Sequence, residues 1–196
     1  MSTKRTRAVI GLLLLGGLAA GAALVAGASR DDAAAGTPSW VAGSLNDTGS
    51  IGVDDGLVAE GESISPFADD LPAIANLEPN LRAAMQDAAR AALADDIDFV
   101  VTSGWRSAAY QQSLLENAII EYGSAEAAGE FVLSPEDSEH VTGEAVDIGR
   151  TDANSWLSQH GADYGLCQIY ANETWHFELA TSPGGECPPQ LANAHG

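Results

Sequence analysis

The sequence predicts an α+β domain in which helices pack on a small, mostly antiparallel sheet. Helical and strand patterns follow one another in the order helix, strand, helix, loop, strand, helix, strand, strand, and this mixed order is typical of that class. Hydrophobic residues make up 45% of the 196 residues, which is enough for one ordinary domain with a buried core. The sequence contains no internal repeat.

The N-terminus has the pattern of an export signal. Basic residues in "MSTKRTR" precede an uncharged apolar run, which is typical of a cleaved signal peptide or of a membrane anchor. We therefore expect residues 1–28 to be a signal peptide or membrane anchor, and the rest to be extracytoplasmic, secreted or anchored at the cell envelope. Residues 29–60 are rich in Gly, Ala, Ser and Asp without a regular period, so a flexible acidic stalk is expected there. The folded domain is expected at residues 61–196.

The domain is expected to begin with a helix, a strand and a second helix. Residues 78–96 place apolar side chains on one helical face, with Pro79 in the first turn. Residues 97–103 form a short run of β-branched and aromatic residues, which is typical of a strand. The second helix is expected between Ser107, which can cap it, and Gly123, which can end it.

The second half of the domain is predicted to supply most of the sheet. Residues 124–137 indicate a loop with room for one helical turn, and a short helix is expected after Asp152, ending at Gly161. Three further strands are expected, at residues 144–149, 166–170 and 175–179. An even pair of cysteines in an exported chain favours a disulfide between Cys167 and Cys187 over two buried free thiols.

The charge of the chain excludes one class of partner. The formal net charge is -20, and only five basic residues follow the apolar run, against 28 acidic ones. No basic surface is therefore available to follow a phosphate backbone, and no nucleic acid is expected as a partner. The acidity itself is most simply explained by solubility.

One acidic residue stands in an unusual place. Asp147 lies within "EAVDIG", which otherwise has the pattern of a buried strand. An ionised carboxylate in such a place is costly unless a cation meets it. An arginine, a lysine and a metal ion are the candidate partners.

Two of the four histidines have acidic residues at short spacing. His140 precedes Asp147 by seven residues, and His176 follows Glu173 by three. Two histidines and one carboxylate form a zinc-ligand set that leaves a fourth position for water, and a nearby glutamate can accept a proton from that water. A turn at Gly143 can bring His140 and Asp147 to the same side, so the zinc site is expected at strand entrances.

Each of these residues also has an ordinary structural interpretation. His140 could be a loop histidine, and His176 a histidine satisfied within the sheet. Asp147 could be a buried acid paired with Arg106 or Arg150. For each residue alone, the structural interpretation is the more common outcome. Taken together, Asp147, the two histidines and the nearby Glu173 favour a metal site.

Three blocks of the sequence resemble one family. "SGWRSAAYQQSL", "SEHVTGEAVDIG" and "ETWHFEL" occur in the order and approximate spacing of the motifs of VanY-type D-alanyl-D-alanine carboxypeptidases. The resemblance implies a zinc peptidase with a small α+β domain that acts on peptidoglycan stem peptides. It implies one zinc ion with the ligands His140, Asp147 and His176. It further implies Glu173 as the catalytic base, Arg106 as the group that stabilises the developing oxyanion, and Gln111 and Ser138 as substrate-binding residues.

The leading interpretation is thus a zinc-dependent carboxypeptidase that removes the C-terminal D-alanine from peptidoglycan stem peptides, with zinc-bound water as the nucleophile. The alternatives are a zinc endopeptidase that cuts an internal stem bond, such as that between L-alanine and D-glutamate, and a non-catalytic wall-binding module. A structural zinc site prefers a closed ligand set and needs neither Glu173 nor Arg106, which favours the enzyme. The expected partners are peptidoglycan stem peptides, and the membrane if the N-terminal segment is uncleaved.

Overall fold

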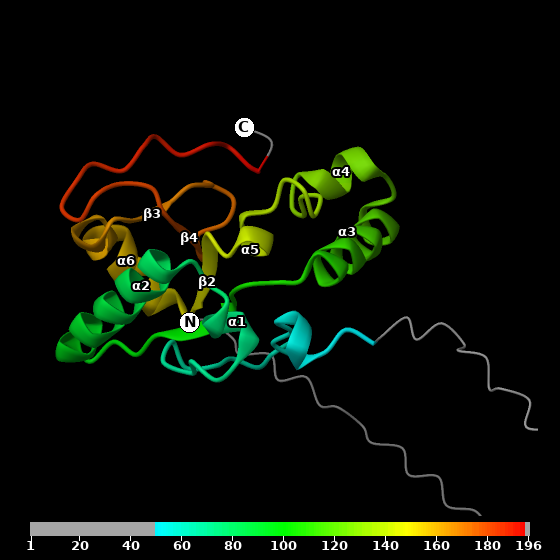
Figure 1. Cartoon of the computed structure of the whole chain (residues 1–196). Helices are drawn as coiled ribbons and strands as arrows, with labels where there is room; N and C mark the ends of the chain where they lie inside the picture. The colour runs from blue at the N-terminus through cyan, green and yellow to red at the C-terminus, as the bar shows by residue number, and fades with distance from the viewer. Residues whose placement is uncertain (1–49, 195–196) are drawn as a thin grey trace, which may run out of the picture. The chain divides into compact units, whose positions relative to one another are not determined.

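The structure is a computed structural model that describes residues 50–194 (Figure 1). The predicted signal or anchor at residues 1–28 lies outside the described residues, as does most of the predicted stalk. Within the described part, no helix combines the length and the apolar character that a membrane crossing requires.

Four strands form one sheet, in the order β1-β2-β4-β3. The strands are β1 Val100–Ser103, β2 Ala145–Gly149, β3 Leu166–Gln168 and β4 His176–Leu179. Every neighbouring pair is antiparallel. The predicted α+β class with a mostly antiparallel sheet is therefore confirmed, although each strand is shorter than its sequence pattern.

Within residues 50–194, six α-helices accompany the sheet, and three of them were predicted. The helices are α1 Pro72–Ala75, α2 Pro79–Ala92, α3 Ala108–Tyr122, α4 Ala125–Gly129, α5 Glu139–Thr142 and α6 Thr151–His160. Short 3-10 turns are found at η1 Val53–Asp55, η2 Leu93–Asp95 and η3 Gly161–Tyr164. The predicted helices correspond to α2, α3 and α6, and α4 occupies the loop in which one turn was expected. α1 and α5 were not predicted, because a single turn is too short to show a helical period.

Local sequence explains where the two longest helices begin and end. The Glu78 carboxylate accepts hydrogen bonds from the first amides of α2, and Pro79 takes the first helical position. The Ser107 hydroxyl accepts a hydrogen bond of 3.0 Å from the Tyr110 amide at the start of α3. α3 ends at Gly123, which has a φ of 81° that is favourable only for glycine.

The hydrophobic core lies between the sheet and the helices α2 and α6 (Figure 1). α2 contributes Leu81 and Met85, and α6 contributes Trp156 and Leu157. The strands face them with Val101, Val146, Ile148, Leu166 and Phe177. Packing of these side chains in the core fixes the register of the strands. Side chains that alternate with them point to the opposite face of the sheet.

The alternation of side chains along β2 and β4 places two predicted site residues on that opposite face. Val146 and Ile148 enter the core, so Asp147 between them projects to the other side. His176 pairs directly with Asp147 across the two strands, whereas its neighbour Phe177 pairs with Val146. All five residues of β2 are buried, which explains the apolar pattern of the strand because both of its faces are covered. The Asp147 carboxylate is therefore shielded from water and needs a cationic partner.

The described end of the predicted stalk packs on the domain. The Ser107 hydroxyl donates a hydrogen bond of 2.7 Å to the Asp55 carboxylate, and the Ser107 amide donates one of 2.9 Å to the Asp55 carbonyl. These bonds fasten Asp55, which falls within the range expected to be a flexible stalk, to the start of α3. Packed residues begin before the boundary expected at residue 61.

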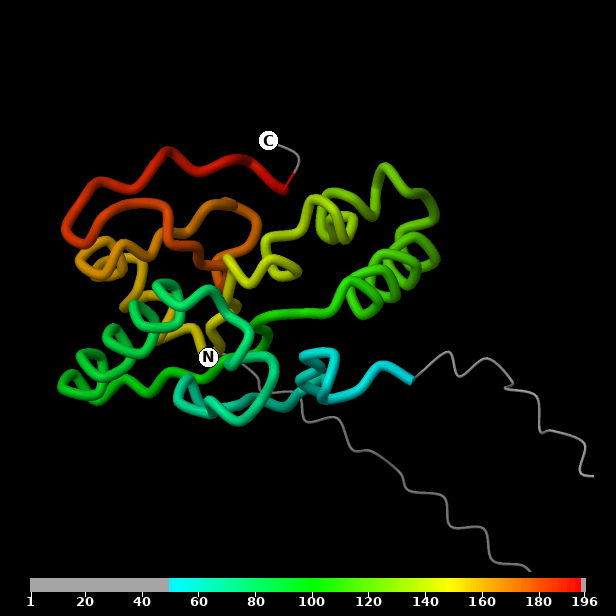
Figure 2. The backbone as a smooth tube through the Cα atoms, viewed as in Figure 1, coloured from blue at the N-terminus to red at the C-terminus, as the bar shows by residue number. Residues whose placement is uncertain are grey.

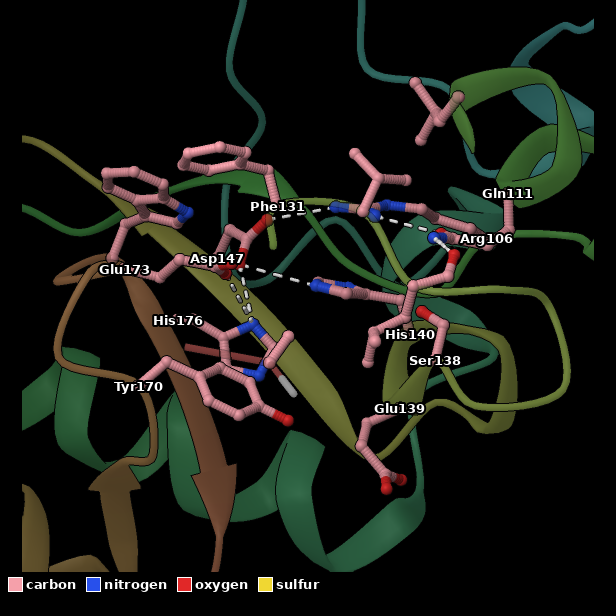
Figure 3. A pocket seen from close by; sticks show the side chains of 15 residues that line it. Arg106, Gln111, Phe131, Ser138, Glu139, His140, Asp147, Tyr170, Glu173 and His176 are labelled. Atoms are coloured by element: carbon pink, nitrogen blue, oxygen red, sulfur yellow. Dashed lines mark hydrogen bonds and ion pairs between the residues drawn. The ribbon is translucent and has the colours of Figure 1, made fainter. Parts of the chain in front are cut away.

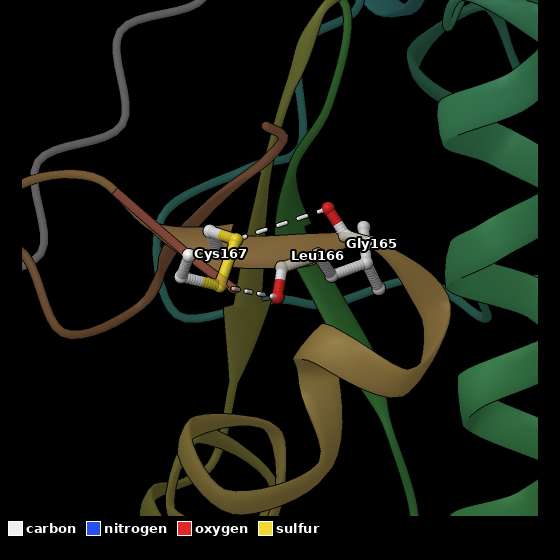
Figure 4. The surroundings of a disulfide bond; sticks show 4 residues. Gly165, Leu166 and Cys167 are labelled. Atoms are coloured by element: carbon white, nitrogen blue, oxygen red, sulfur yellow. Dashed lines mark hydrogen bonds between the residues drawn. A yellow bond between two sulfur atoms is a disulfide. The ribbon is translucent and has the colours of Figure 1, made fainter. Parts of the chain in front are cut away.

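The predicted disulfide between Cys167 and Cys187 is present (Figure 4). It attaches the C-terminal part of the chain to β3. Beyond it, Leu191 exchanges backbone hydrogen bonds of 2.9 Å with Ile169 and Ala171. Figure 2 shows this part of the chain in red, running past the segment that contains β3.

Candidate metal centre

The helix α5 positions His140. This single turn follows Ser138 and closes at Gly143, which has a φ of 80°. A Cβ atom at Gly143 would lie 2.5 Å from the Asn76 carbonyl oxygen, so only glycine fits there. The expected turn at Gly143 is thus observed, but His140 lies on a one-turn helix rather than in a strand entrance.

The side chains of His140, Asp147 and His176 point toward one another (Figure 3). The Oδ1 atom of Asp147 lies 3.4 Å from Nε2 of His140 and 3.3 Å from Nδ1 of His176. All three potential ligand atoms lie within 4.8 Å of one another, and all three residues are buried. The structure therefore brings the predicted zinc ligands together.

Hydrogen bonds determine which nitrogen of each histidine faces this cluster. Nδ1 of His140 lies 2.8 Å from the Gly104 carbonyl oxygen, and Nε2 of His176 lies 3.0 Å from Oε1 of Glu178. Both of these partners accept hydrogen bonds, so these nitrogens carry the protons. Nε2 of His140 and Nδ1 of His176 then face Asp147, and each can bind a cation once it carries no proton, as in most protein metal sites with histidine ligands.

The cluster fits a zinc ion. Oδ1 of Asp147 and Nδ1 of His176 are buried and have no hydrogen-bond partner, which is costly unless another group meets them. Zinc bonds of about 2.0–2.2 Å in a tetrahedron place neighbouring ligand atoms about 3.4 Å apart. The two separations at Asp147 have this value, and nitrogen and carboxylate ligands suit zinc.

Arg106 supports the other oxygen of the same carboxylate. Its Nη2 atom lies 3.1 Å from Oδ2 of Asp147, and both side chains are largely buried. The structural interpretation of Asp147 as a partner of Arg106 is thus correct for one oxygen and leaves Oδ1 unexplained. Arg150 lies elsewhere, 3.9 Å from Asp98 on the exposed surface.

The charges in the cluster shift the pKa values of its members. Burial lowers the pKa of His140, and the nearby charge of Arg106 lowers it further. Burial alone would raise the pKa of Asp147, but His140, His176 and Arg106 outweigh it and hold the pKa below its ordinary value. Burial would lower the pKa of His176, but the carboxylates of Asp147 and Glu178 raise it to about 9. The Asp147 carboxylate is therefore ionised and attracts positive charge strongly.

Glu173 lies beside the cluster in the loop before β4. Its Oε2 atom is 3.8 Å from Nδ1 of His176, and 13% of its side chain is exposed. Burial raises the pKa of Glu173 above its ordinary value, and the charge of Asp147 adds to this effect, while His176 and Arg106 oppose it. A carboxyl group with a raised pKa is suited to exchange protons near neutral pH.

The cluster lies in a pocket. Apolar side chains of Leu114, Phe131, Val132, Leu133 and Trp175 form much of the lining, together with Tyr170, Ala194 and the predicted site residues. Gln111 is buried and uses its amide within the protein: Oε1 accepts a bond of 3.0 Å from Arg106, and Nε2 donates one of 2.9 Å to the Leu133 carbonyl. Ser138 is buried at the start of α5 and lines the pocket.

One protein-family model matches the part of the chain that contains this cluster. The model of the VanY family, described as D-alanyl-D-alanine carboxypeptidase, matches residues 74–182. This range covers more than half of the chain and contains every predicted site residue. The chain belongs to the VanY family.

Individual relatives of the VanY family match in part. A D-alanyl-D-alanine carboxypeptidase of Enterococcus faecalis is 31% identical over 118 residues, which are 47% of this chain and 44% of that protein. The chain thus spans less than half the length of this relative. A solved structure of a vancomycin-resistance D,D-pentapeptidase VanY variant with Zn(II) has a TM-score of 0.49 and 27% identity, and covers 52% of this chain and 71% of that one. The D,D-dipeptidase VanXYg, solved with a D-Ala-D-Ala phosphinate analog, has a TM-score of 0.50 and 22% identity over 62% of this chain and 56% of that one, and shares the fold.

Sequence reasoning missed two polar groups that contact His176 in this VanY-family chain. Glu178 is the hydrogen-bond partner of His176, and the two-residue spacing along a strand could have placed them on the same face. The ring of Tyr170 lies 5.0 Å from that of His176, and burial together with Glu178, Glu139 and Glu173 raises its pKa to about 12. Nothing in the sequence around Tyr170 indicated this position. Among residues 50–194, the buried polar and charged side chains are Gln111, Ser138, His140, Asp147 and His176, and all of them had been selected from the sequence.

Proposed function

We propose that this chain is a zinc-dependent D,D-carboxypeptidase that removes the terminal D-alanine from peptidoglycan stem peptides outside the cytoplasm. The observation that carries the proposal is the cluster of buried ligand atoms at Asp147, His140 and His176, which opens on a pocket beside Glu173. Membership of a family described as D-alanyl-D-alanine carboxypeptidase supports the choice of substrate.

A zinc ion held by these three residues would polarise a substrate carbonyl and activate a water molecule. Glu173 would accept the proton of the attacking water, and the separation of 3.8 Å between its carboxylate and Nδ1 of His176 supports this role. Its raised pKa then favours delivery of that proton to the leaving amine, here the amino group of D-alanine.

Arg106 would stabilise the oxygen on which negative charge develops. Its Nε, Nη1 and Nη2 atoms donate to Ser103, Gln111 and Asp147. A guanidinium group has five N–H donors, so each terminal nitrogen keeps one N–H for a substrate oxygen. Because the other three bonds fix its position, Arg106 is preorganised for this task.

The pocket also explains how a short peptide could be held. Its lining combines the polar groups of the cluster with the apolar side chains of Leu114, Phe131 and Leu133. Such a pocket suits a small peptide end with methyl side chains, as in D-alanyl-D-alanine.

The deciding experiment is product analysis of the purified, zinc-loaded chain. We expect free D-alanine from a stem pentapeptide that ends in D-Ala-D-Ala, and little release from a tetrapeptide that ends in a single D-alanine. Release from the tetrapeptide alone would indicate an L,D-carboxypeptidase instead, and an internally cut stem would indicate an endopeptidase.

Replacement of the base tests the mechanism separately. Glu173→Gln should retain bound zinc, because Glu173 is not one of the three ligands, but lower kcat by about 10²–10⁴-fold. A chain that binds zinc yet cleaves no stem peptide in either form would support the wall-binding module and reject the enzyme.

A further inference from the structure

The C-terminal segment, residues 187–194, is attached to the domain at three places. Cys187 is bonded to Cys167 of β3. Leu191 donates a hydrogen bond to the Ile169 carbonyl and accepts one from the Ala171 amide, each of 2.9 Å. The segment therefore pairs with the loop that leaves β3 as if it were a short parallel strand.

The loop that it contacts is the one that carries the proposed base. Residues 169–175 connect β3 with β4 and include both Tyr170 and Glu173. On one side the loop is paired with Leu191. The Asn172 side chain donates a hydrogen bond of 3.3 Å to the carbonyl of Glu130, which precedes the pocket residue Phe131. The end of the loop near β4 is held separately, because the Thr174 carbonyl accepts a hydrogen bond of 2.6 Å from the Gln168 side chain and the Trp175 carbonyl accepts one of 2.9 Å from the Ile148 amide. The C-terminal segment therefore supports the first part of the loop, around Tyr170 and Ala171.

The segment then reaches the pocket itself. Ala194 is one of the residues that line it, together with Tyr170 and Glu173. Ala192, two residues earlier, is exposed and does not line the pocket.

We propose that the C-terminal segment is a wall of the substrate pocket with two roles: Ala194 limits the space beside Glu173, and the pairing at Leu191 fixes the loop that carries Glu173. Neither role involves the three metal-ligating side chains, which lie on α5, β2 and β4. The inference rests on the proposed peptidase function for its kinetic test, and on the backbone pairing alone for its structural test.

The first role is tested by enlarging one side chain. In the zinc-loaded full chain, Ala194→Leu should raise KM for the stem pentapeptide by about 10-fold while kcat changes little, because a pocket that gains methylene groups loses affinity of this order. Ala192→Leu is the matched control and should leave both constants unchanged. Equal KM values for Ala194→Leu and the unchanged chain would overturn the assignment of Ala194 to the pocket wall.

The second role is tested by ending the chain after Gln190, which keeps the disulfide and removes Leu191. Hydrogen exchange should become faster at the Ala171 amide, which loses its acceptor, and across residues 169–175, while zinc content stays the same. For the stem pentapeptide, kcat should fall by about 10–100-fold, because a small displacement of a catalytic group has effects of this size.

The two failures can be told apart. If the unchanged chain hydrolyses no stem peptide, the proposed function fails, and hydrogen exchange still tests the support of the loop. If the unchanged chain is active and the shortened chain shows the same exchange and the same kcat, the proposal for the C-terminal segment is wrong.

Discussion

Removal of the Glu178 carboxylate should weaken zinc binding although Glu178 is not a ligand. Its Oε1 atom accepts a hydrogen bond of 3.0 Å from Nε2 of His176, and 19% of its side chain is exposed. This bond keeps a proton on Nε2 and turns Nδ1 toward Asp147, where a metal ion would replace the second proton of the ring. In Glu178→Ala, the imidazole can rotate or move its proton to Nδ1, and both changes compete with metal binding.

Two independent magnitudes give the size of the effect. Loss of a carboxylate partner of a metal-ligating histidine typically lowers metal affinity about 10–100-fold, or about 1.4–2.7 kcal/mol. A hydrogen bond to a charged group contributes about 1.5–3 kcal/mol when it is protected from water. Because Glu178 is partly exposed, we expect the lower half of this range, about 10–30-fold.

The assay is competition for zinc between the protein and a chromophoric chelator. Glu178→Gln keeps an oxygen acceptor at the same place and should recover part of the loss. Glu144→Gln removes the same charge from the neighbouring acidic residues, but Glu144 is bonded to Thr142 rather than to His176, so zinc affinity should change little. Wild-type affinity in Glu178→Ala would refute the reasoning, and an equal loss in Glu144→Gln would show that only the overall negative charge matters.

Three further changes test the frame around the centre. Gly143→Ala and Gly123→Ala both place a side chain at a φ near 80°, which costs about 1–2 kcal/mol, but only at Gly143 would the new Cβ atom also meet a carbonyl oxygen at 2.5 Å. Urea unfolding should therefore show a larger loss of stability for Gly143→Ala than for Gly123→Ala. Equal losses of stability would argue against the close approach at Gly143. Replacing both Cys167 and Cys187 with alanine removes a cross-link over a sequence separation of 20 and should lower the free energy of unfolding by about 3 kcal/mol. The midpoint of unfolding in denaturant should then be lower, and an unchanged midpoint would contradict a stabilising role of the disulfide. Arg106→Ala leaves the buried Asp147 carboxylate without its cation and should lower the free energy of unfolding of the zinc-free chain by about 3 kcal/mol. Arg106→Lys keeps a positive charge and should lose less stability. Equal stability of the unchanged chain and both variants would contradict a structural contribution from Arg106.

The fold shows which helices sequence patterns can predict. α2, α3 and α6 could be predicted because each is long enough to show a helical period and has a capping residue, such as Ser107, or a terminating glycine. The one-turn helix α5 could not be predicted, since its four residues provide no period and its geometry depends on packing of Gly143 against the Asn76 carbonyl. For the same reason His140 was expected in a strand entrance.

The site shows a similar division. Asp147 stood out because an acid in an apolar strand needs a cation, and the same argument left open whether that cation was Arg106 or a metal. The structure assigns Oδ2 to Arg106 and leaves Oδ1 facing two histidines. No sequence pattern distinguishes the two oxygens of one carboxylate.

The sequence by itself determined the class of fold, the family, the pairing of Cys167 with Cys187, and the residues selected as a site. Each of these depends on local periodicity, on residue type or on a motif of a few neighbouring residues. Only the tertiary structure decided that Glu178 holds His176, that residues 50–60 pack on the domain, and that Ala194 lines the pocket. Those features arise where segments distant in the sequence meet, and the free energy of such contacts depends on distances and burial that exist only once the chain has folded.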